Sequence, residues 1–361
     1  MTAPTLIQEA EHPLSILYLG RYAGTSRHRA DSLVRLGHKV RVLDIESNLP
    51  QQRLREFWVH HTGALALGSL VRALVLTRIG SERFDLVWVD GGALFSPPLI
   101  RDLRKRAEFV VNYNLDDPYG TRDARKWRFY LRSVPEYDYV VVVRDCNVPE
   151  AYQAGARSVI RAHRSADEVA HAPRPVAPEN QERWSSEVVF VGTWMPERGP
   201  FLARLIQKGV PVSIWGDRWI KAPEFATLRG HWRGPGLHDD ADYALAIQYS
   251  RVCLGLLSKG NRDLCTTRTF EIPYLGGLLC AERTPEHQGL YEEGAEAVFW
   301  SDADECAEQC AQLLMDESRR LRIARNGQLR NLRNRTTNEA VLSEVLSRVT
   351  TSLQPALHGI A

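Results

Sequence analysis

The sequence predicts an α/β protein with two domains, each a parallel sheet covered by helices, facing each other across a cleft. Three observations lead to this prediction. The chain has 361 residues, enough for two domains of ordinary size. Its composition, 44% hydrophobic and 25% charged, is typical of globular proteins. The order of strand, glycine-containing loop, helix and strand occurs twice, on either side of a proline-rich segment.

The first domain is predicted over residues 1–165. An apolar strand at 15–20 ends in glycine, a helix follows at 26–36, and a second strand follows at 39–44. Three further apolar runs, separated by helical stretches, extend the predicted parallel sheet; they are 86–89, 109–112 and 139–143.

A proline-rich stretch at 172–180 indicates an extended crossing, so we expect a linker over 166–186. The same order of strand, glycine-containing turn, helix and strand then begins again in a second domain, 187–335. Its predicted strands are 188–192, 210–215, 252–257, 277–281 and 297–300, and its helices are 200–207, 267–275 and 303–315. The strongly basic stretch 319–350 is predicted to be helical. Residues 336–361 are expected to form a terminal helix that could return to the first domain.

Charge and patterning exclude several classes of protein. The 46 basic and 44 acidic residues give a net charge of +2, which favours neither nucleic acid nor a membrane as partner. The apolar run at 63–76 is broken by Arg72, and the first residues lack the features of a signal peptide. We therefore expect a cytoplasmic protein without a transmembrane segment.

The six cysteines show no C-x-x-C pair or zinc-type spacing, so they are expected to be reduced and mostly buried. Cys306 and Cys310 lie one helical turn apart. They could hold a metal only if two more ligands arrived from elsewhere, and a plain helix face is the simpler interpretation.

The polar stretch 258–280 is the strongest candidate for a ligand site. Ligands of doubly wound sheets collect at the carboxyl ends of strands, and this stretch follows a predicted strand. Thr266, Thr267 and Arg268 stand where the next helix begins and suit a diphosphate. The carboxylate of Glu271, one turn further, could accept hydrogen bonds from both hydroxyls of a ribose. Alternatively, Thr266 caps the helix and Glu271 makes a surface ion pair.

The segment 267–277, TRTFEIPYLGG, together with 282–286, 290–294 and 297–300, resembles the signature block of the CgeB-like (spore-maturation-protein-type) glycosyltransferases of the GT-B fold. The resemblance covers residues 186–335. The first domain is similar in layout only, and 112–118 is its best match. The resemblance implies that the second domain holds a nucleotide-diphosphate sugar and the first holds a hydroxyl-bearing acceptor, such as a glycan, a glycoconjugate or a small aglycone.

The resemblance also implies roles for single residues. Glu271 maps to the ribose-binding glutamate, and Asp263 stands eight positions earlier, where many relatives carry a longer acid. Arg198, in the turn after Gly192, maps to the basic residue that meets the diphosphate; the alternative is an exposed arginine in a turn. Trp232 could stack on a nucleobase or pack in the core. The expected donor-binding set is Gly192, Arg198, Trp232, Asn261, Asp263, Thr266, Thr267, Arg268 and Glu271.

Sugar transfer needs a base for the acceptor hydroxyl and neutralisation of the leaving diphosphate. Arg198, Arg268 and the helix start can serve the second purpose, so no metal cofactor is expected. Asp116 and Asp117 follow a strand of the first domain, and an aspartate base suits an inverting displacement. The alternative is that they form a turn. His28 is a third candidate, although most lone histidines are packing or surface residues.

Two other functions compete with this interpretation. A dinucleotide-dependent oxidoreductase would use the loop at 20–24, but G-x-G-x-x-G is absent and Asp44 alone is weak evidence. A non-catalytic nucleotide- or sugar-binding protein would need Glu271 and Arg268. Its function would tolerate the loss of the three catalytic candidates, Asp116, Asp117 and His28. The D-x-D sequences at 240–242 and 302–304 are better explained as helix caps than as metal ligands.

Overall fold

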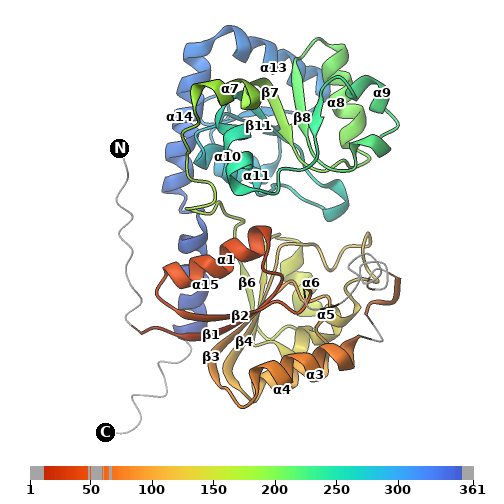
Figure 1. Ribbon diagram of the computed structural model, residues 1–361, viewed down its shortest axis with the longest axis vertical. Helices are drawn as coiled ribbons and strands as arrows, with labels where there is room; N and C mark the ends of the chain where they lie inside the picture. Colours follow the sequence, from red (N-terminus) through yellow and green to blue (C-terminus); the bar gives the residue numbers. More distant parts are fainter. Residues whose placement is uncertain (1–11, 48, 50–58, 60, 65–66, 352–361) are drawn as a thin grey trace. The chain divides into compact units, whose positions relative to one another are not determined.

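The computed structural model describes residues 12–47, 49, 59, 61–64 and 67–351. These residues form two compact units (Figure 1). The first unit comprises the described residues up to His163 together with those from Asn338 onward, and the second is Arg164–Thr337. The crossing into the second unit therefore falls at residues 163 and 164. Segment 166–186 is part of that unit and includes a short helix, α7 (Pro178–Trp184).

The first unit is built on a six-stranded sheet in the order β2-β1-β3-β4-β5-β6, and every pair in it is parallel. Parallel sheets are covered on both faces, which explains why these strands read as nearly continuous apolar runs. The strands are β1 (Ser15–Leu19), β2 (Lys39–Leu43), β3 (Phe84–Asp90), β4 (Ala107–Asn114), β5 (Tyr139–Val142) and β6 (Val159–Arg161).

Alternate residues of these strands enter two different cores. Leu17, Val87 and Val89 pack with α3 (Gly68–Ile79), α4 (Pro97–Arg104), α5 (Arg128–Ser133) and α6 (Asn147–Gln153). Ile16 and Trp88 pack on the other face with α1 (Gly24–Arg35) and α15 (Asn338–Thr350). In Figure 1, α15 lies beside α1, and Arg35 Nε donates to Glu339 Oε1 at 2.5 Å.

The second unit repeats this plan with a parallel sheet in the order β12-β11-β10-β7-β8-β9. The strands are β7 (Ser186–Val191), β8 (Val212–Trp215), β9 (Trp232–Gly234), β10 (Ser250–Gly255), β11 (Leu279–Glu282) and β12 (Val298–Trp300). One face packs on α8 (Arg198–Gln207), α9 (Phe225–Leu228) and α13 (Ala303–Met315). The other packs on α10 (Asp240–Gln248), α11 (Arg268–Tyr274) and α12 (Pro285–Leu290).

The basic stretch at 319–350 is two helices rather than one. Helix α14 (Glu317–Arg333) contacts α11 and α13, and α15 starts again at Asn338. Arg335, between them, has φ of 53°, a left-handed conformation that a helix cannot accommodate. This break allows the chain to leave the second unit and complete the first.

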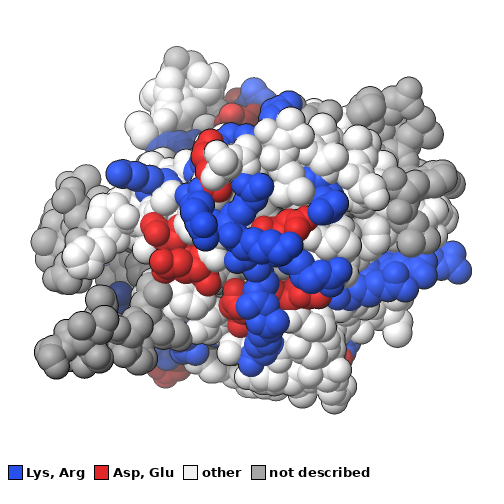
Figure 2. All heavy atoms as spheres, turned by 90° about the horizontal axis from the view of Figure 1, so that it is seen from below, with Lys and Arg blue, Asp and Glu red and all other residues white. Residues whose placement is uncertain are grey.

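Acidic side chains stand among the basic ones on the molecular surface. Figure 2 shows Asp and Glu side chains between the Lys and Arg side chains of the face that it draws. In the first unit, Arg72 pairs with Asp102 at 2.6 Å and Arg101 pairs with Glu136 at 2.6 Å. Many basic groups are therefore neutralised locally.

Within the part of the chain that the structure describes, every helix is too short or too polar to cross a lipid bilayer.

Candidate functional site

The carboxyl edge of the second sheet carries a cavity of about 230 Å³. Because all six strands are parallel, the loops that follow β7, β10, β11 and β12 meet at this edge. The cavity is lined by Arg198 at the start of α8, by Leu256 and Leu257 after β10, by Glu282 of β11 and by Asp302 after β12. The sequence predicted a ligand site at this edge.

Arg198 is buried at the wall of this cavity, with 8% of its surface exposed. Its guanidinium donates to the carbonyl of Thr193 at 2.8 Å, and to those of Leu256 and Leu257 at 3.1 and 3.2 Å. The alternative of an exposed arginine in a turn is therefore wrong. The guanidinium ties the loop after β7 to the end of β10, a structural role that the sequence did not indicate.

Gly192 opens this loop at a point where two backbones touch. A Cβ atom on Gly216, which follows β8, would lie 1.9 Å from the carbonyl oxygen of Gly192. The same oxygen accepts a hydrogen bond of 2.9 Å from the indole of Trp219. Glycine at 216 is required by this approach.

Glu271 lies in α11 and is 3% exposed, so the alternative of a surface ion pair is wrong. Tyr243 of α10 donates to its Oε2 at 2.6 Å. Arg268 Nε lies 3.9 Å from the same oxygen, and His171 Nε2 lies 3.7 Å from Oε1. Glu271, Tyr243 and His171 are buried, whereas the Arg268 side chain is 36% exposed. The four residues are called here the Glu271 cluster.

Two members of the Glu271 cluster were not singled out from the sequence. His171 comes from the predicted linker, and its Nδ1 accepts a hydrogen bond of 2.8 Å from the backbone N–H of Asp167. A neutral ring therefore carries its proton on Nε2, toward Glu271. Burial, and then the neighbouring Glu271 carboxylate, raise the pKa of Tyr243 well above its usual range, so its hydroxyl stays protonated.

The two threonines before α11 do not cap it with their side chains. The N–H of Thr266 donates to Thr269 Oγ1 at 3.2 Å, and Thr267 Oγ1 accepts from Arg268 Nη1 at 3.0 Å. Arg268 also lies over the ring of Tyr243, 5.5 Å from its centroid. Thr269 in turn bonds His287, whose pKa is lowered by burial.

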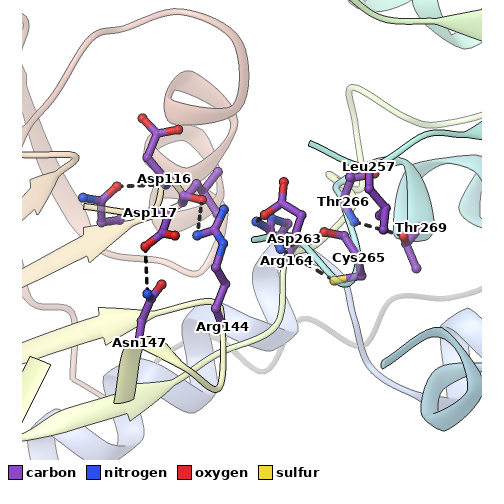
Figure 3. Close-up of polar contacts among 12 residues, drawn as sticks. Asp116, Asp117, Arg144, Asn147, Arg164, Leu257, Asp263, Cys265, Thr266 and Thr269 are labelled. Carbon is purple, nitrogen blue, oxygen red and sulfur yellow. Dashed lines mark hydrogen bonds and ion pairs between the residues drawn. The ribbon is translucent and has the colours of Figure 1, made fainter. Parts of the chain in front are cut away.

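Asp263 forms a buried ion pair with Arg164, a residue that nothing in the sequence pointed to (Figure 3). Arg164 Nη2 and Asp263 Oδ1 are 2.7 Å apart, and the two side chains are 5% and 6% exposed. Arg164 Nη1 also donates to the Cys265 carbonyl at 3.0 Å. Asp263, eight positions before Glu271, therefore already has the Arg164 guanidinium as its charge partner.

Trp232 and Asn261 are both half-buried, so they are less accessible than we expect of residues that contact a ligand. Trp232, in β9, packs edge-on against Phe225, with ring centroids 5.9 Å apart, and its indole donates to the Gly216 carbonyl at 3.1 Å. These contacts agree with the core-packing alternative. Asn261 ends a short 3-10 turn and is half-buried.

In the first unit, Asp116 and Asp117 have different environments (Figure 3). Asp117 is 4% exposed and accepts from the Gly120 N–H at 3.1 Å and from Asn147 Nδ2 at 2.9 Å, as a turn-forming residue does. The Asp116 side chain is 48% exposed and lies 3.3 Å from Lys126 Nζ. Only Asp116 of the two has an accessible carboxylate.

His28 is 6% exposed within α1, as expected for a packing residue. Its neighbour Arg29 makes the contact that the sequence did not reveal. Arg29 donates to both carboxylate oxygens of Asp90, at 2.7 and 2.9 Å, and Tyr18 donates to the same carboxylate at 2.7 Å. This buried network holds α1 against the ends of β1 and β3.

Comparison with known proteins agrees with this architecture. Residues 198–347 match the family described as "Glycosyl transferase-like". No curated protein sequence matches the chain. Among solved structures, the chain is similar to HepE of Anabaena in complex with UDP-glucose, with 12% identity and a TM-score of 0.64 over 94% of this chain and 100% of that one.

Two further structures show the same fold. Sucrose-phosphate synthase from Thermosynechococcus elongatus is 13% identical, with a TM-score of 0.67 over 94% of this chain and 99% of that one. A glycosyltransferase from Rickettsia africae is 12% identical, with a TM-score of 0.61 over 95% and 100%.

The predicted GT-B architecture is confirmed by these matches and by the two six-stranded parallel sheets. The chain therefore has the GT-B fold, and residues 198–347 are similar to the glycosyl transferase-like family.

Proposed function

We propose that this protein is a glycosyltransferase related to the CgeB-like type, and that its second unit holds a nucleotide-diphosphate sugar as donor. The Glu271 cluster carries the proposal, because it holds a buried carboxylate one turn inside a helix whose first residue is Arg268. HepE, which shares the fold, binds UDP and UDP-glucose.

In this proposal the Glu271 carboxylate accepts hydrogen bonds from the two ribose hydroxyls, and Tyr243 and His171 hold that carboxylate in place. Arg268 and the wall residue Arg198 face the diphosphate. Helix α11 has seven residues, so its dipole alone is a weak source of positive charge. The guanidinium groups therefore provide most of the neutralisation that the leaving group needs, and the reaction does not depend on a metal ion.

We assign Asp263 a different role from the one that the resemblance implies. Its carboxylate is bonded to Arg164, so a direct contact to the donor sugar would require breaking a buried ion pair. Asp263 is proposed to hold the loop before α11 in shape.

The proposed base is Asp116. Its carboxylate takes the proton of the acceptor hydroxyl while that oxygen attacks C1 of the donor sugar. The bond between C1 and the phosphate oxygen breaks, and the nucleoside diphosphate leaves. Asp117 shapes the loop that carries Asp116.

Calorimetry with UDP, GDP, ADP and UDP-glucose tests the donor proposal. We expect at least one nucleotide to bind. Glu271→Gln should weaken its binding about tenfold or more, because a neutral amide cannot replace the charge-assisted hydrogen bonds that the carboxylate accepts from two hydroxyls. Glu296→Gln is the matched control, because Glu296 is also buried in this unit and accepts from the Glu292 N–H and Arg333.

Unchanged affinity in Glu271→Gln would refute the assigned site. Binding of a pyridine dinucleotide in place of every nucleoside diphosphate would favour the oxidoreductase alternative. Release of nucleoside diphosphate from a nucleotide sugar distinguishes an enzyme from a binding protein.

A further inference from the structure

Three cysteine sulfurs converge in the core of the second unit. Cys280 lies on β11, and Cys306 and Cys310 lie one turn apart on α13. Each is 0% exposed, and their Sγ atoms all lie within 4.8 Å of one another. From the sequence, Cys306 and Cys310 could hold a metal only with two further ligands, and the fold brings one more sulfur, that of Cys280, to them.

The sheet geometry explains why Cys280 meets the other two. Its neighbours on β11, Leu279 and Ala281, belong to the core on the opposite face. Cys280 points to the face covered by α13, where it joins the core that contains Cys306, Cys310 and Leu313. Both α13 cysteines lie on the helix side that packs against the sheet.

A buried cysteine usually behaves as a small apolar side chain. These three differ because one atom could bond to all of them. With a metal–sulfur bond of about 2.3 Å, three sulfurs on one ion stand about 4 Å apart. Small side-chain rotations therefore bring the present sulfurs to that spacing.

The surroundings decide which kind of ion fits. The cluster is enclosed by apolar side chains such as Leu254, Val298 and Leu313. Three thiolates on a divalent ion leave one net negative charge in this core, and burying an unpaired charge is costly. Three thiolates on a trivalent ion leave none.

We propose that Cys280, Cys306 and Cys310 form a three-thiol site for a thiophilic trivalent ion, for which trivalent arsenic is the probe. Arsenous acid reacts with the three thiols to give As(S-Cys)₃ and three molecules of water. Three S–H and three As–O bonds break, while three As–S and three O–H bonds form. Arsenic stays trivalent, and no oxidant or reductant is needed.

The test incubates the reduced 361-residue chain with sodium arsenite and measures its mass under native conditions. We expect one adduct, with the mass of one arsenic atom less three hydrogens, and a melting temperature raised by several degrees because the cross-link restricts the unfolded chain. Cys280→Ala, Cys306→Ala and Cys310→Ala should each abolish this adduct. Cys253→Ala, which removes another fully buried cysteine of the same unit, should retain it.

Circular dichroism verifies that each variant is folded, and a serine replaces alanine where it is not. Three results would overturn the proposal: no adduct on the folded wild-type protein, an adduct that keeps an arsenic hydroxyl and so uses two sulfurs, or an adduct that survives Cys310→Ala. In a competition at equal concentrations, preferential capture of cadmium would overturn the preference for a trivalent ion.

Discussion

The hydroxyl of Tyr243 donates a hydrogen bond of 2.6 Å to Glu271 Oε2, and the residues are 7% and 3% exposed. Two helices that cover the same face of the second sheet, α10 and α11, are joined by this bond. A buried carboxylate without such partners would be strongly destabilising. The bond therefore holds the Glu271 carboxylate in a fixed orientation at the proposed ribose position.

Tyr243→Phe is expected to weaken nucleotide binding about tenfold or more. The change removes one hydrogen bond to a charged group, worth about 1.5 kcal/mol or more, and leaves the ring in place. Calorimetry with the nucleotide that binds the wild type measures the effect. Tyr249→Phe is the control, since Tyr249 ends the same helix and packs against the same core. Equal affinities for Tyr243→Phe and the wild type would refute a positioning role.

Arg164→Met should lower the free energy of unfolding by about 3–5 kcal/mol, because it leaves the Asp263 carboxylate buried without its charge partner. Adding Asp263→Asn to this variant should recover much of the loss. Urea unfolding of the two single variants and the double variant measures the coupling.

Arg251→Met serves as a matched control for the buried pair. Its partner is Glu187, at 3.0 Å, and the two side chains are 51% and 44% exposed. An exposed pair contributes less than about 1 kcal/mol. A similar loss in both arginine variants would mean that burial of the Arg164 pair has no special effect.

Asp116→Asn and Asp117→Asn should have different effects. If Asp116 is the base, its variant loses about 10²- to 10⁴-fold in kcat and still binds the donor. Asp117→Asn weakens the hydrogen bonds to Gly120 and Asn147, so it should lower the melting temperature more than Asp116→Asn does. Steady-state assays and thermal unfolding separate the two effects. Normal turnover in Asp116→Asn would place the base elsewhere.

The ion pair between Arg283 and Glu305 should make stability depend on pH. Hydrogen bonds from Arg283 lower the pKa of Glu305 from 4.5 to about 2. A lowered pKa in the folded state stabilises the protein above about pH 4.5, and this contribution is lost as the pH falls toward 2.

Glu305→Gln tests this dependence. It should lower the free energy of unfolding by up to about 1 kcal/mol at pH 7, a modest effect because the pair is partly exposed. The difference from the wild type should shrink at pH 3. A difference that grows in acid would contradict the assigned cause.

Local patterns predicted five of the six strands in each sheet. The helix expected over 303–315 has those bounds in the structure, and the first strand and helix are displaced by no more than two residues. Hydrophobic periodicity and glycine loops are short-range signals, so they can be read without knowing the fold. The short strands β6 and β9 were missed. The equally short β12 was predicted, because all three of its residues are apolar, whereas β6 and β9 each contain an arginine.

The sequence by itself determined the two-sheet architecture, the polar stretch before Glu271 and the class of activity that the stretch resembles. Tertiary structure alone decided which side chains meet there. Arg164 reaches Asp263 across 99 positions, Tyr243 reaches Glu271 across 28, and Cys280 joins two cysteines of a later helix. Such pairs are selected by the packing of whole elements against a sheet, and no local periodicity records which partners that packing brings together.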